Sequence, residues 1–346
     1  MRAILMERFG GPLVLAEVAD PELPEDGVII QVGATGICRS DWHAWMGHDP
    51  DVGLPHVPGH ELAGTIVAAG PRVRRWRPDD RVTLPFCCGC GTCPQCQAGD
   101  QQVCPNQYQP GFTGWGSFAQ LVAVPYADAN LVRLPENLGF VEAAALGCRV
   151  ITSFRGVVDQ GRTRPGEWLA IHGCGGVGLA ALLIGRALGA RTICVDIKPG
   201  KLELARRLGA DAVVDASSQT DVVGAIQEIT GGGAQVSIDA LGSPSTCRNS
   251  IRCLARRGRH VQIGLTLADH KDVSVPMNEV IARELELYGS HGMQAHRFRD
   301  LLGLITAGKL DPAQLVRRRV PLAEAPAELA AMTRFEQEGI SVIDRF

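Results

Sequence analysis

The sequence lacks three features that would place it in a specialised class. No uninterrupted apolar run reaches the roughly 20 residues needed to cross a bilayer, which excludes a chain that spans the membrane as helices. Neither sign of charge is in large excess: the formal net charge is -3 and the basic residues are scattered, so we expect no nucleic-acid or membrane partner. The 41 glycines have no fixed period, which excludes a collagen-like repeat.

The amino terminus also lacks the pattern of a secretory signal. The segment MRAILMERFGG reaches Glu7 and Arg8 before any apolar run develops. Twelve cysteines without such a signal indicate reduced thiols and bound metal rather than a disulfide cluster. We therefore expect a cytoplasmic protein.

A chain of 346 residues, 45% of them hydrophobic, is long enough for about two domains. In its first part, short apolar runs broken by glycine and proline, such as GVIIQVGATG and ELAGTIVAAG, predict the strands of an all-β, barrel-like domain. From Glu167 onward, β-branched runs alternate with amphipathic helical stretches. This alternation is typical of an α/β domain with a doubly wound parallel sheet.

The alternation ends after Gly289, where a strand at about 285–288 completes a six-stranded sheet. The tail beyond it contains a helix-like segment, FRDLLGLITAGKL, and a strand-like segment, GISVIDRF, which we assign to the first domain. The first domain is thus expected to comprise residues 1–149 and 291–346, and the second residues 150–290. No low-complexity linker is visible, so the junctions are expected to be packed hinges.

The most informative motif is CGCGTCPQCQAGDQQVC, which contains four cysteines at C-x2-C-x2-C-x7-C spacing. Four thiolates in a segment that glycine and proline let fold back supply the ligands of a closed, tetrahedral structural zinc site. Cys87 and Cys88 lie just outside the pattern, although either could replace Cys90 as a ligand. The expected ligands of this structural zinc lobe, at about 87–104, are Cys90, Cys93, Cys96 and Cys104.

A glycine-rich turn, GCGGVG, directly follows the predicted strand EWLAIH and opens the predicted helix LAALLIGRALG. A lone G-x-G-x-x-G motif is a weak signal, but this strand-turn-helix context is the one that binds the pyrophosphate of a dinucleotide. The glycines permit a tight turn, close approach of the pyrophosphate and close packing of the helix on the sheet. The residues of the turn expected to bind the cofactor are Gly173, Gly175, Gly176, Val177 and Gly178.

Asp196 ends the next predicted strand, TICVDI. A carboxylate at this position accepts hydrogen bonds from the ribose hydroxyls of NAD and repels the additional phosphate of NADP, so we predict NAD as the cofactor. Lys201 is near enough in sequence to assist at the ribose, although a lysine on a helix surface is as often merely solvated. The alternative is a glycine turn with an unrelated aspartate.

Three further segments carry metal-ligand residues far apart in the chain. Cys38 lies in GATGICRSDWH, His60 and Glu61 in PGHELAG, and Cys148 in AAALGCRVITS. Taken singly, Cys148 fits a buried small hydrophobic residue and His60 fits an ordinary loop residue. Together, two cysteines and a histidine leave one coordination position open, which is typical of a catalytic zinc that acts on a substrate oxygen as a Lewis acid.

The chain resembles the zinc-dependent medium-chain alcohol dehydrogenases over essentially its whole length. The resemblance lies in these three segments, the four-cysteine lobe and the GCGGVG turn, and in the order in which they follow one another. The resemblance implies a GroES-like β-barrel catalytic domain, a Rossmann domain, and two zinc ions per chain. It implies reversible hydride transfer between an alcohol and NAD, with an aldehyde or ketone as product, at a cleft between the domains. It also implies a homotetramer or a homodimer.

Roles for single residues follow from this resemblance. Cys38, His60 and Cys148 match the ligands of the catalytic zinc, and Glu61 matches a carboxylate able to approach it. The matches for the proton path are Ser40, which takes the alcohol proton, and His43, at the outer end of a relay, both of which also fit ordinary loop residues. The remaining matches are Asp41, which accepts the second ring N–H of His60, Arg39 at the pyrophosphate and Thr152 at the nicotinamide ring.

Four aromatic residues are candidates for the substrate pocket. Phe86 and Phe112 match positions that line the alcohol pocket of the resembling family, and Trp42 and Trp115 lie in the same loops. An aromatic wall leaves the hydroxyls of a sugar alcohol without partners, so we predict apolar primary or secondary alcohols over sorbitol, glycerol or threonine. Core packing is the alternative for the aromatic residues.

Other functions stay open at this point. A zinc-free quinone reductase of the same superfamily would share the nucleotide fold but need none of the cysteines. A polyol or threonine dehydrogenase would also bind zinc, although Cys148 in place of a carboxylate favours simple alcohols. A non-enzymatic sensor or structural protein that binds zinc and a nucleotide would need neither Ser40 nor His43 beside the metal ligands.

Overall fold

The computed structural model describes residues 1–266, 271–334 and 337–346. Contacts between these residues divide the chain into two compact units. The first unit comprises Met1–Ile151, Gly292–Leu302 and Pro312–Phe346, and the second comprises Thr152–His291 and Gly303–Asp311. Each unit has a sheet of its own, and the first is assembled from segments far apart in the sequence.

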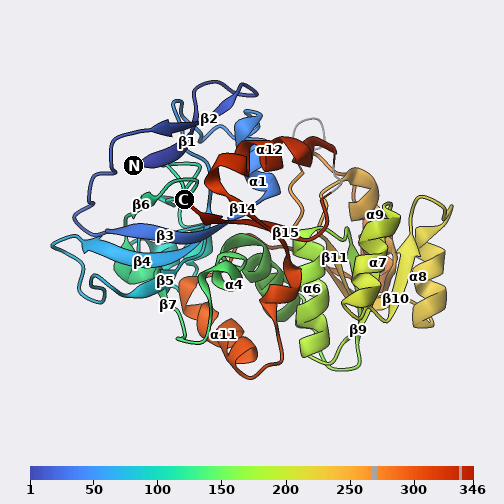
Figure 1. The fold of residues 1–346 in the computed structure, drawn as a ribbon. Coiled ribbons are helices and arrows are strands. Elements are labelled where there is room, and N and C mark those ends of the chain that lie inside the picture. The colour runs from blue at the N-terminus through green and yellow to red at the C-terminus, as the bar shows by residue number, and fades with distance from the viewer. Residues whose placement is uncertain (267–270, 335–336) are drawn as a thin grey trace. The chain divides into compact units, whose positions relative to one another are not determined.

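The main sheet of the first unit is built around β3. Its strands, from one edge to the other, are β14 (Val316–Pro321), β15 (Ile340–Arg345), β3 (Val28–Ile37), β4 (Glu61–Ala69), β5 (Arg81–Thr83) and β7 (Val132–Arg133), with β6 (Leu121–Val124) also paired to β3. The red strand β15 lies against the blue strand β3 in Figure 1, and the two pair antiparallel with Ser341 opposite Ile37. A separate two-stranded sheet consists of β1 (Arg2–Met6) and β2 (Leu13–Glu17).

Alternating apolar side chains of these strands fill the interior of the first unit. Val28, Ile30 and Val32 occupy every second position of β3 and are buried together with Leu62 and Ile66 of β4. This period of two is the one that predicted strands in GVIIQVGATG and ELAGTIVAAG. Strand β3 is internal to this sheet, because it pairs with β4 along one edge and with β15 and β6 along the other.

Short helices follow the strands of the first unit. Helix α1 (Arg39–Trp45) begins directly after β3, and α4 (Phe140–Ala144) leads into a π-helical segment, Leu146–Val150. The other helical segments of this part of the fold are α2 (Pro94–Gln97), α3 (Ala127–Asn130), α12 (Ala325–Ala331) and the 3-10 turns Gln101–Val103, Ala295–Arg297, Pro312–Leu315, Leu322–Glu324 and Met332–Arg334. Helix α11 (Phe298–Thr306) begins in the first unit and ends in the second. In the described ranges, no helix combines the length and apolar character needed to cross a membrane.

The second unit contains a six-stranded parallel sheet. In spatial order its strands are β10 (Ala212–Asp215), β9 (Arg191–Asp196), β8 (Trp168–His172), β11 (Ala234–Asp239), β12 (Leu254–Gln262) and β13 (Glu286–Gly289). Counted along the chain, this is the 3-2-1-4-5-6 order of a doubly wound dinucleotide-binding sheet, whose direction of winding reverses between β8 and β11. The predicted doubly wound sheet is therefore confirmed, including its sixth strand.

Helices connect the strands of this parallel sheet. They are α6 (Gly176–Ala187), α7 (Pro199–Arg207), α8 (Val222–Thr230), α9 (Pro244–Arg252) and α10 (Met277–Arg283), while α5 (Ile151–Phe154) and the π-helical segment Arg155–Gln160 precede the first strand, β8. Local sequence sets several of their ends. The carboxylate of Asp221 caps α8, which ends at Gly231 with a φ of 71°, and Ser243 and Thr246 form a capping box at the start of α9.

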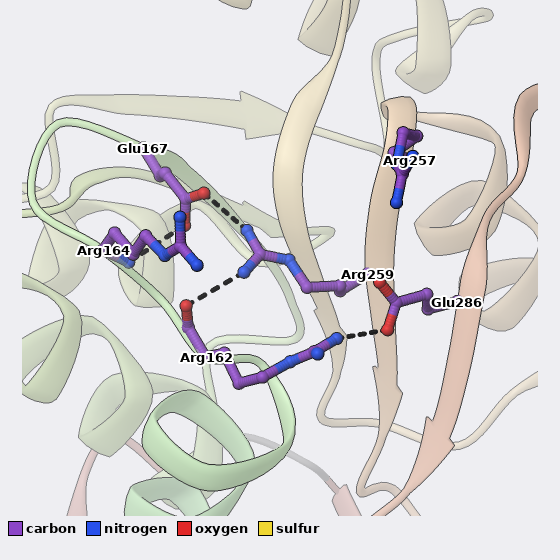
Figure 2. A pocket seen from close by; sticks show the side chains of 6 residues that line it. All are labelled: Arg162, Arg164, Glu167, Arg257, Arg259 and Glu286. Carbon is purple, nitrogen blue, oxygen red and sulfur yellow. Dashed lines mark hydrogen bonds and ion pairs between the residues drawn. The ribbon is translucent and has the colours of Figure 1, made fainter.

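Figure 2 shows a pocket of the second unit that is lined by charged side chains. The Arg259 guanidinium donates to the Glu167 carboxylate at 2.6 Å and to the Arg162 carbonyl oxygen at 2.9 Å. Arg162 in turn pairs with Glu286, the first residue of β13. Both carboxylates are thus engaged in ion pairs that tie the segment before β8 to β12 and β13, which gives this pocket a structural role.

Candidate functional site

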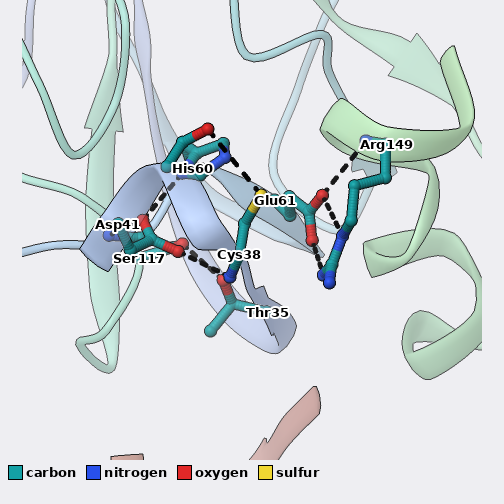
Figure 3. A network of polar contacts seen from close by, with 9 residues as sticks. Thr35, Cys38, Asp41, His60, Glu61, Ser117 and Arg149 are labelled. Carbon is teal, nitrogen blue, oxygen red and sulfur yellow. Dashed lines mark hydrogen bonds and ion pairs between the residues drawn. The ribbon is translucent and has the colours of Figure 1, made fainter. Parts of the chain in front are cut away.

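The loop after β3 carries the first candidate metal ligand. Cys38 precedes α1, and its backbone N–H donates to Asp41 Oδ2 at 2.9 Å, so that the carboxylate caps the first turn of the helix. Through Oδ1 the same carboxylate accepts from the Gly59 N–H at 3.1 Å and from His60 Nδ1 at 2.7 Å. Asp41 is fully buried, and Figure 3 shows it beside the His60 ring. One carboxylate therefore ties two loops together and orients the histidine.

His60 keeps one ring nitrogen available for a ligand. In the neutral ring, Nδ1 donates to Asp41 and Nε2 carries the lone pair, and this atom is buried without a hydrogen-bond partner. Burial lowers the pKa of His60, but the charge and hydrogen bond of Asp41 outweigh it and raise this pKa well above its ordinary value, so a bound metal ion would displace a proton from Nε2. Candidate ligand atoms of Cys38, His60, Glu61 and Cys148 lie within 4.8 Å of one another. A buried nitrogen lone pair and two thiols at this separation fit a tetrahedral metal ion with one position left open. The residues present thus fit the zinc ion that the family implies.

The two thiols of this cluster are coupled. A hydrogen bond with Cys148 holds the pKa of Cys38 well below its usual value, and the positive charge of Arg149 acts in the same direction. The same hydrogen bond, together with burial, raises the pKa of Cys148. The pair therefore shares one proton in the absence of metal. Because metal ligands are thiolates, a bound divalent ion displaces that proton.

Glu61 is held by an arginine that the sequence analysis did not single out. Arg149 donates to Glu61 Oε1 from its backbone N–H at 3.1 Å and from Nε at 2.9 Å, and to Oε2 from Nη2, as Figure 3 shows. Both side chains are buried. A Cβ at Gly36 would overlap the carboxylate, so this position needs glycine. Burial raises the pKa of Glu61 while Arg149 opposes that rise, and the ion pair fixes the carboxylate beside the ligand atoms.

The available signal for Arg149 was a single arginine inside the apolar run AAALGCRVITS. Arginine is rarely buried unless its charge is paired, so its position directly after Cys148 indicates a buried carboxylate partner. The sequence alone does not say which carboxylate it meets. The partner depends on how closely the π-helical segment approaches β4. This approach is tight, since a Cβ added at Gly147 would lie only 3.0 Å from the Cα of Glu61.

The four cysteines of the loop also come together. Their sulfur atoms lie within 4.8 Å of one another, with 3.7 Å between those of Cys93 and Cys104. Backbone N–H groups point at two of the sulfurs: that of Cys96 donates to Cys93 at 3.5 Å, and that of Cys90 donates to Cys104 at 3.3 Å. A hydrogen bond with Thr92 lowers the pKa of Cys90 to about 5. Four clustered sulfurs, two of which already accept backbone hydrogen bonds, fit a closed zinc site.

The two cysteines just before this loop lie outside the cluster. Cys88 is fully buried and its thiol donates to the Pro85 carbonyl oxygen at 3.4 Å, whereas the thiol of Cys87 donates to the Met293 carbonyl oxygen at 3.8 Å. The twelve cysteines all lie in the described residues, and none of them forms a disulfide. Of the possibilities that the spacing left open, the structure therefore groups Cys90, and neither of its two neighbours, with the other three ligands.

The expected proton-path residues lie on α1, beside the first candidate ligand. Ser40 Oγ lies 3.9 Å from Cys38 Sγ. His43 is half-buried, and its Nδ1 lies 3.0 Å from Nδ1 of His48, a residue that the sequence analysis did not consider. Burial, the charge of Arg39 and the charge of His48 lower the pKa of His43 to about 4. At neutral pH the His43 ring is therefore neutral and able to accept a proton and pass it on.

Two of the four candidate pocket aromatics contact the His60 ring. The ring centroid of Phe112 lies 5.3 Å from that of His60 and the centroid of Phe86 lies 6.0 Å away, both in edge-on arrangements. Both phenylalanines are buried. They give the histidine ring two apolar neighbours.

The two tryptophans have other contacts. Trp42 donates its indole N–H to Thr333 Oγ1 at 3.0 Å, and the Arg39 guanidinium lies 3.9 Å above its ring. Arg39 also donates to the Met332 carbonyl oxygen. Trp115 is partly exposed and donates to a backbone carbonyl oxygen at 3.1 Å. In this structure, Trp42 and Arg39 pack against each other and against the 3-10 turn Met332–Arg334.

The glycine turn of the second unit lies at the carboxyl end of β8. Gly173 has a φ of 98°, and a Cβ at Gly178 would overlap the Gly173 carbonyl oxygen, so both positions need glycine. A Cβ at Gly175 would meet no protein atom within 4 Å. The protein itself therefore leaves open the space at Gly175, where a pyrophosphate has to approach the backbone.

Asp196 is joined directly to this turn. Its Oδ2 accepts from the Cys174 N–H at 2.8 Å and its Oδ1 accepts from the Lys198 N–H at 3.0 Å. A carboxylate has further lone pairs, so these two bonds position it and leave capacity for ribose hydroxyls. Lys201 lies in the first turn of α7, and Thr152 is buried in α5.

Comparisons with known proteins agree with this arrangement. Residues 24–136 match the model of the alcohol dehydrogenase GroES-like domain, and residues 176–307 match that of the zinc-binding dehydrogenase. An NAD-dependent alcohol dehydrogenase of Sulfurisphaera tokodaii is 34% identical over 99% of both chains, and an alcohol dehydrogenase of Rhizobium meliloti is 35% identical over 84% of both. The crystal structure of benzyl alcohol dehydrogenase from Acinetobacter calcoaceticus superposes with a TM-score of 0.92 at 27% identity, covering 100% of this chain and 99% of the other.

The doubly wound sheet with its glycine turn is typical of a dinucleotide site, and the cysteine-histidine cluster is typical of a metal site. Together these two features define a metal-dependent oxidoreductase. The matches over both units make the family explicit. The chain belongs to the zinc-dependent medium-chain alcohol dehydrogenases.

Proposed function

We propose that this protein oxidises alcohols with NAD, and reduces the corresponding aldehydes or ketones, using one catalytic and one structural zinc ion per chain. The observation that carries the proposal is the buried Nε2 of His60, which has no partner and lies with the Cys38 and Cys148 thiols in one cluster. Residues 1–149 and 291–346 would form the catalytic domain and residues 150–290 the NAD-binding domain. The expected cytoplasmic location, and the homotetrameric or homodimeric state, rest on the resemblance alone.

The chain's own residues prepare the metal site. When bound, zinc polarises the alcohol oxygen and NAD accepts the hydride. Asp41 keeps the proton of the His60 ring on Nδ1, so that Nε2 is free to ligate. Cys38 and Cys148 supply the negative charge that offsets a divalent ion. Arg149 neutralises the Glu61 carboxylate, which would otherwise add a third negative charge to the cluster.

The proton of the alcohol leaves through α1. Ser40 lies next to Cys38 and takes the proton from the substrate hydroxyl, and His43 accepts it further along the path. Since the pKa of His43 lies near 4, this ring passes a proton on rather than storing it. The roles of Ser40 and His43 rest on their matches in the family together with these positions.

The cofactor is NAD. Asp196 presents a carboxylate at the glycine turn, where it favours the two ribose hydroxyls of NAD and disfavours the phosphate of NADP. The turn residues Gly173 to Gly178 would receive the pyrophosphate, with Arg39 at the pyrophosphate, Lys201 at the ribose and Thr152 at the nicotinamide. The open space at Gly175 supports the pyrophosphate position.

The substrate is an apolar primary or secondary alcohol. Phe86 and Phe112 flank the His60 ring and would form the aromatic wall of the pocket, with Trp42 and Trp115 as further candidates. An aromatic wall satisfies a hydrocarbon chain or ring but leaves the extra hydroxyls of a polyol, or the charges of threonine, without partners. We therefore expect a higher kcat/KM for apolar alcohols than for sorbitol, glycerol or threonine.

The test combines metal analysis with NAD reduction followed by absorbance over this panel of alcohols. The Cys148→Ala variant should retain its fold, drop from two zinc ions per chain to one, and lose activity by at least about a thousandfold, since a Lewis-acid metal supplies several kcal/mol. The matched Cys96→Ala variant should lose thermal stability first. One zinc in the unmodified protein, or full activity of Cys148→Ala, would contradict the zinc assignment. A polyol or threonine as the best substrate would contradict the pocket alone, and no alcohol-dependent reduction of NAD would favour a non-enzymatic protein.

A further inference from the structure

Two histidine rings meet at the end of α1. Nδ1 of His43 lies 3.0 Å from Nδ1 of His48, and the ring centroids are 5.3 Å apart. The Trp42 ring packs edge-on against both, with its centroid 5.0 Å from His43 and 5.5 Å from His48. Two ring nitrogens at this distance need one N–H donor and one lone pair, so the pair holds a single proton between them.

The backbone holds this pair in place. Helix α1 ends in a motif in which the His48 N–H donates to the His43 carbonyl oxygen at 3.0 Å and the Gly47 N–H donates to the Ala44 carbonyl oxygen at 3.1 Å. These are the two hydrogen bonds of a Schellman motif, which requires a left-handed residue between them. Gly47 has a φ of 74°, and a Cβ there would lie 3.1 Å from the Phe9 ring. The turn therefore brings His48 back over His43 as part of the fold.

The two rings differ in their access to water. His43 is half-buried, whereas His48 is exposed. With Nδ1 engaged, Nε2 is the nitrogen through which His43 takes up a proton. The shared Nδ1 proton can then move to His48, and His48 can release a proton from its own Nε2 to water. One proton enters the pair, one leaves it, and no electrons move.

We infer that His48 is the outer end of the proton path, through which His43 exchanges protons with solvent. This inference rests on the proposed function, in which His43 receives the proton of the alcohol. His48 acts through His43 and does not touch the reacting atoms. It positions the Nδ1 proton of His43 and connects that ring to water. The path thus has one step more than the family resemblance supplies.

The inference is tested with the zinc-loaded enzyme, NAD and the best alcohol of the panel, by stopped-flow measurement of proton release with a pH indicator in weakly buffered solution. In His48→Gln, proton release and kcat should fall about tenfold, less than the roughly hundredfold or larger contribution of a group that exchanges a proton with the reacting atoms, because His48 acts through His43. The KM values and the zinc content should stay unchanged. Added imidazole should restore the rate, because the position of His48 is open to solvent. His296→Gln, which replaces another exposed histidine of the first unit, should behave as the unmodified enzyme.

The outcomes separate this inference from the proposed function. A normal rate of proton release in His48→Gln, with a slow rate in His43→Gln, would overturn the role of His48 and leave that of His43 intact. A slow His48→Gln variant that imidazole does not restore, and whose Tm is lowered, would show a structural role and also overturn the inference. Unchanged rates in His43→Gln would overturn the proposed relay itself, and the role of His48 with it.

Discussion

Buried titratable groups are treated differently in the two units. Around the candidate metal cluster of the first unit, carboxylates are buried against basic side chains: Glu61 forms an ion pair with Arg149, and Asp41 accepts a hydrogen bond from His60. In the second unit, a chain of buried groups runs through the sheet as neutral hydrogen-bonding partners. Its members are, in order of contact, His172, Cys253, Ser237, Ser250 and His260.

The pKa values express this difference. Burial lowers the pKa of His172 to about 3 and that of His260 to about 4, and it raises the pKa of Cys253 to about 12, so all three are uncharged at neutral pH. A buried carboxylate of the same unit, Asp239, accepts from the backbone N–H groups of Leu241 and Gly242. The groups of this chain are thus stabilised by uncharged donors and acceptors, whereas the buried Arg259 of the same unit is paired with Glu167.

The comparison indicates where chemistry is to be sought. Burying a charge is costly unless an opposite charge or a metal ion lies beside it, whereas a neutral buried network is satisfied by its own hydrogen bonds. The first unit concentrates charge around a cluster that also contains an unpartnered His60 nitrogen, which is typical of a functional site. The chain from His172 to His260 is complete in itself and is a structural feature.

The largest effect is expected when the paired charges are broken. Arg149→Met leaves the Glu61 carboxylate buried without its partner, and removing one member of a buried pair costs about 3–5 kcal/mol. Calorimetry should show a large drop in Tm. The double variant Arg149→Met with Glu61→Gln should recover most of this loss, because no uncompensated charge remains. A loss below about 1 kcal/mol in the single variant would mean that the ion pair is not the main support of this cluster.

A smaller effect is expected when the neutral histidines are driven toward protonation. Their pKa values are lower in the folded protein than the ordinary 6.5, so the unfolded chain binds more protons as the pH falls below that value. The free energy of unfolding is therefore unaffected by these groups above about pH 6.5. It decreases as the pH falls from there toward 4, by up to about 1.4 kcal/mol per pH unit for each histidine.

Hydrogen exchange of the amides of β8, β11 and β12 over this pH range measures this loss. His260→Gln should reduce the slope of local stability against pH by up to half, whatever its effect on absolute stability. His296→Gln is the matched control, because that histidine is exposed and should leave the slope unchanged. An unaltered slope in His260→Gln would show that the buried chain does not set the acid sensitivity of the second unit.

The smallest effect concerns a charge of the second unit that is not buried in the core. Asp196 is partly exposed and held by two backbone N–H groups beside the glycine turn. Asp196→Gly should raise the KM for NAD about tenfold and narrow or reverse the preference over NADP, with a smaller change in kcat. Steady-state kinetics with both cofactors gives the answer. Equal use of NAD and NADP by the unmodified enzyme would count against this assignment.

Features with local sequence causes could be predicted. The spacing from Cys90 to Cys104, the glycines of the GCGGVG turn and the period of two in β3 each arise within a short segment, and the structure places all of them as expected. The cluster of Cys38, His60 and Cys148 required the resemblance to a family, because its ligands come from separate loops. The structure brings them together at the end of β3, before β4 and in the π-helical segment.

Features that depend on packing were missed. The partner of Arg149 is set by how the π-helical segment approaches β4, and no pattern in the sequence reports that distance. His48 looks like an ordinary loop residue until the Schellman motif folds it back over His43. The contacts of Trp42 and Arg39 with the turn Met332–Arg334, far along the chain, also have no signal in the sequence.

The position of β15 beside β3 has a consequence for biosynthesis. During translation, β3 and Cys38 leave the ribosome long before β15, whose Ser341 pairs with Ile37. Until then β3 has an open edge directly before the first candidate ligand, and open edges are sites of mispairing. The segment from Cys90 to Cys104 can bind its metal ion before the rest of the chain is made, because all four of its ligands leave the ribosome together. Metal loading is therefore expected to be ordered in time, with the four-cysteine loop filled during synthesis and the Cys38 cluster completed only after the whole nucleotide-binding unit has been made.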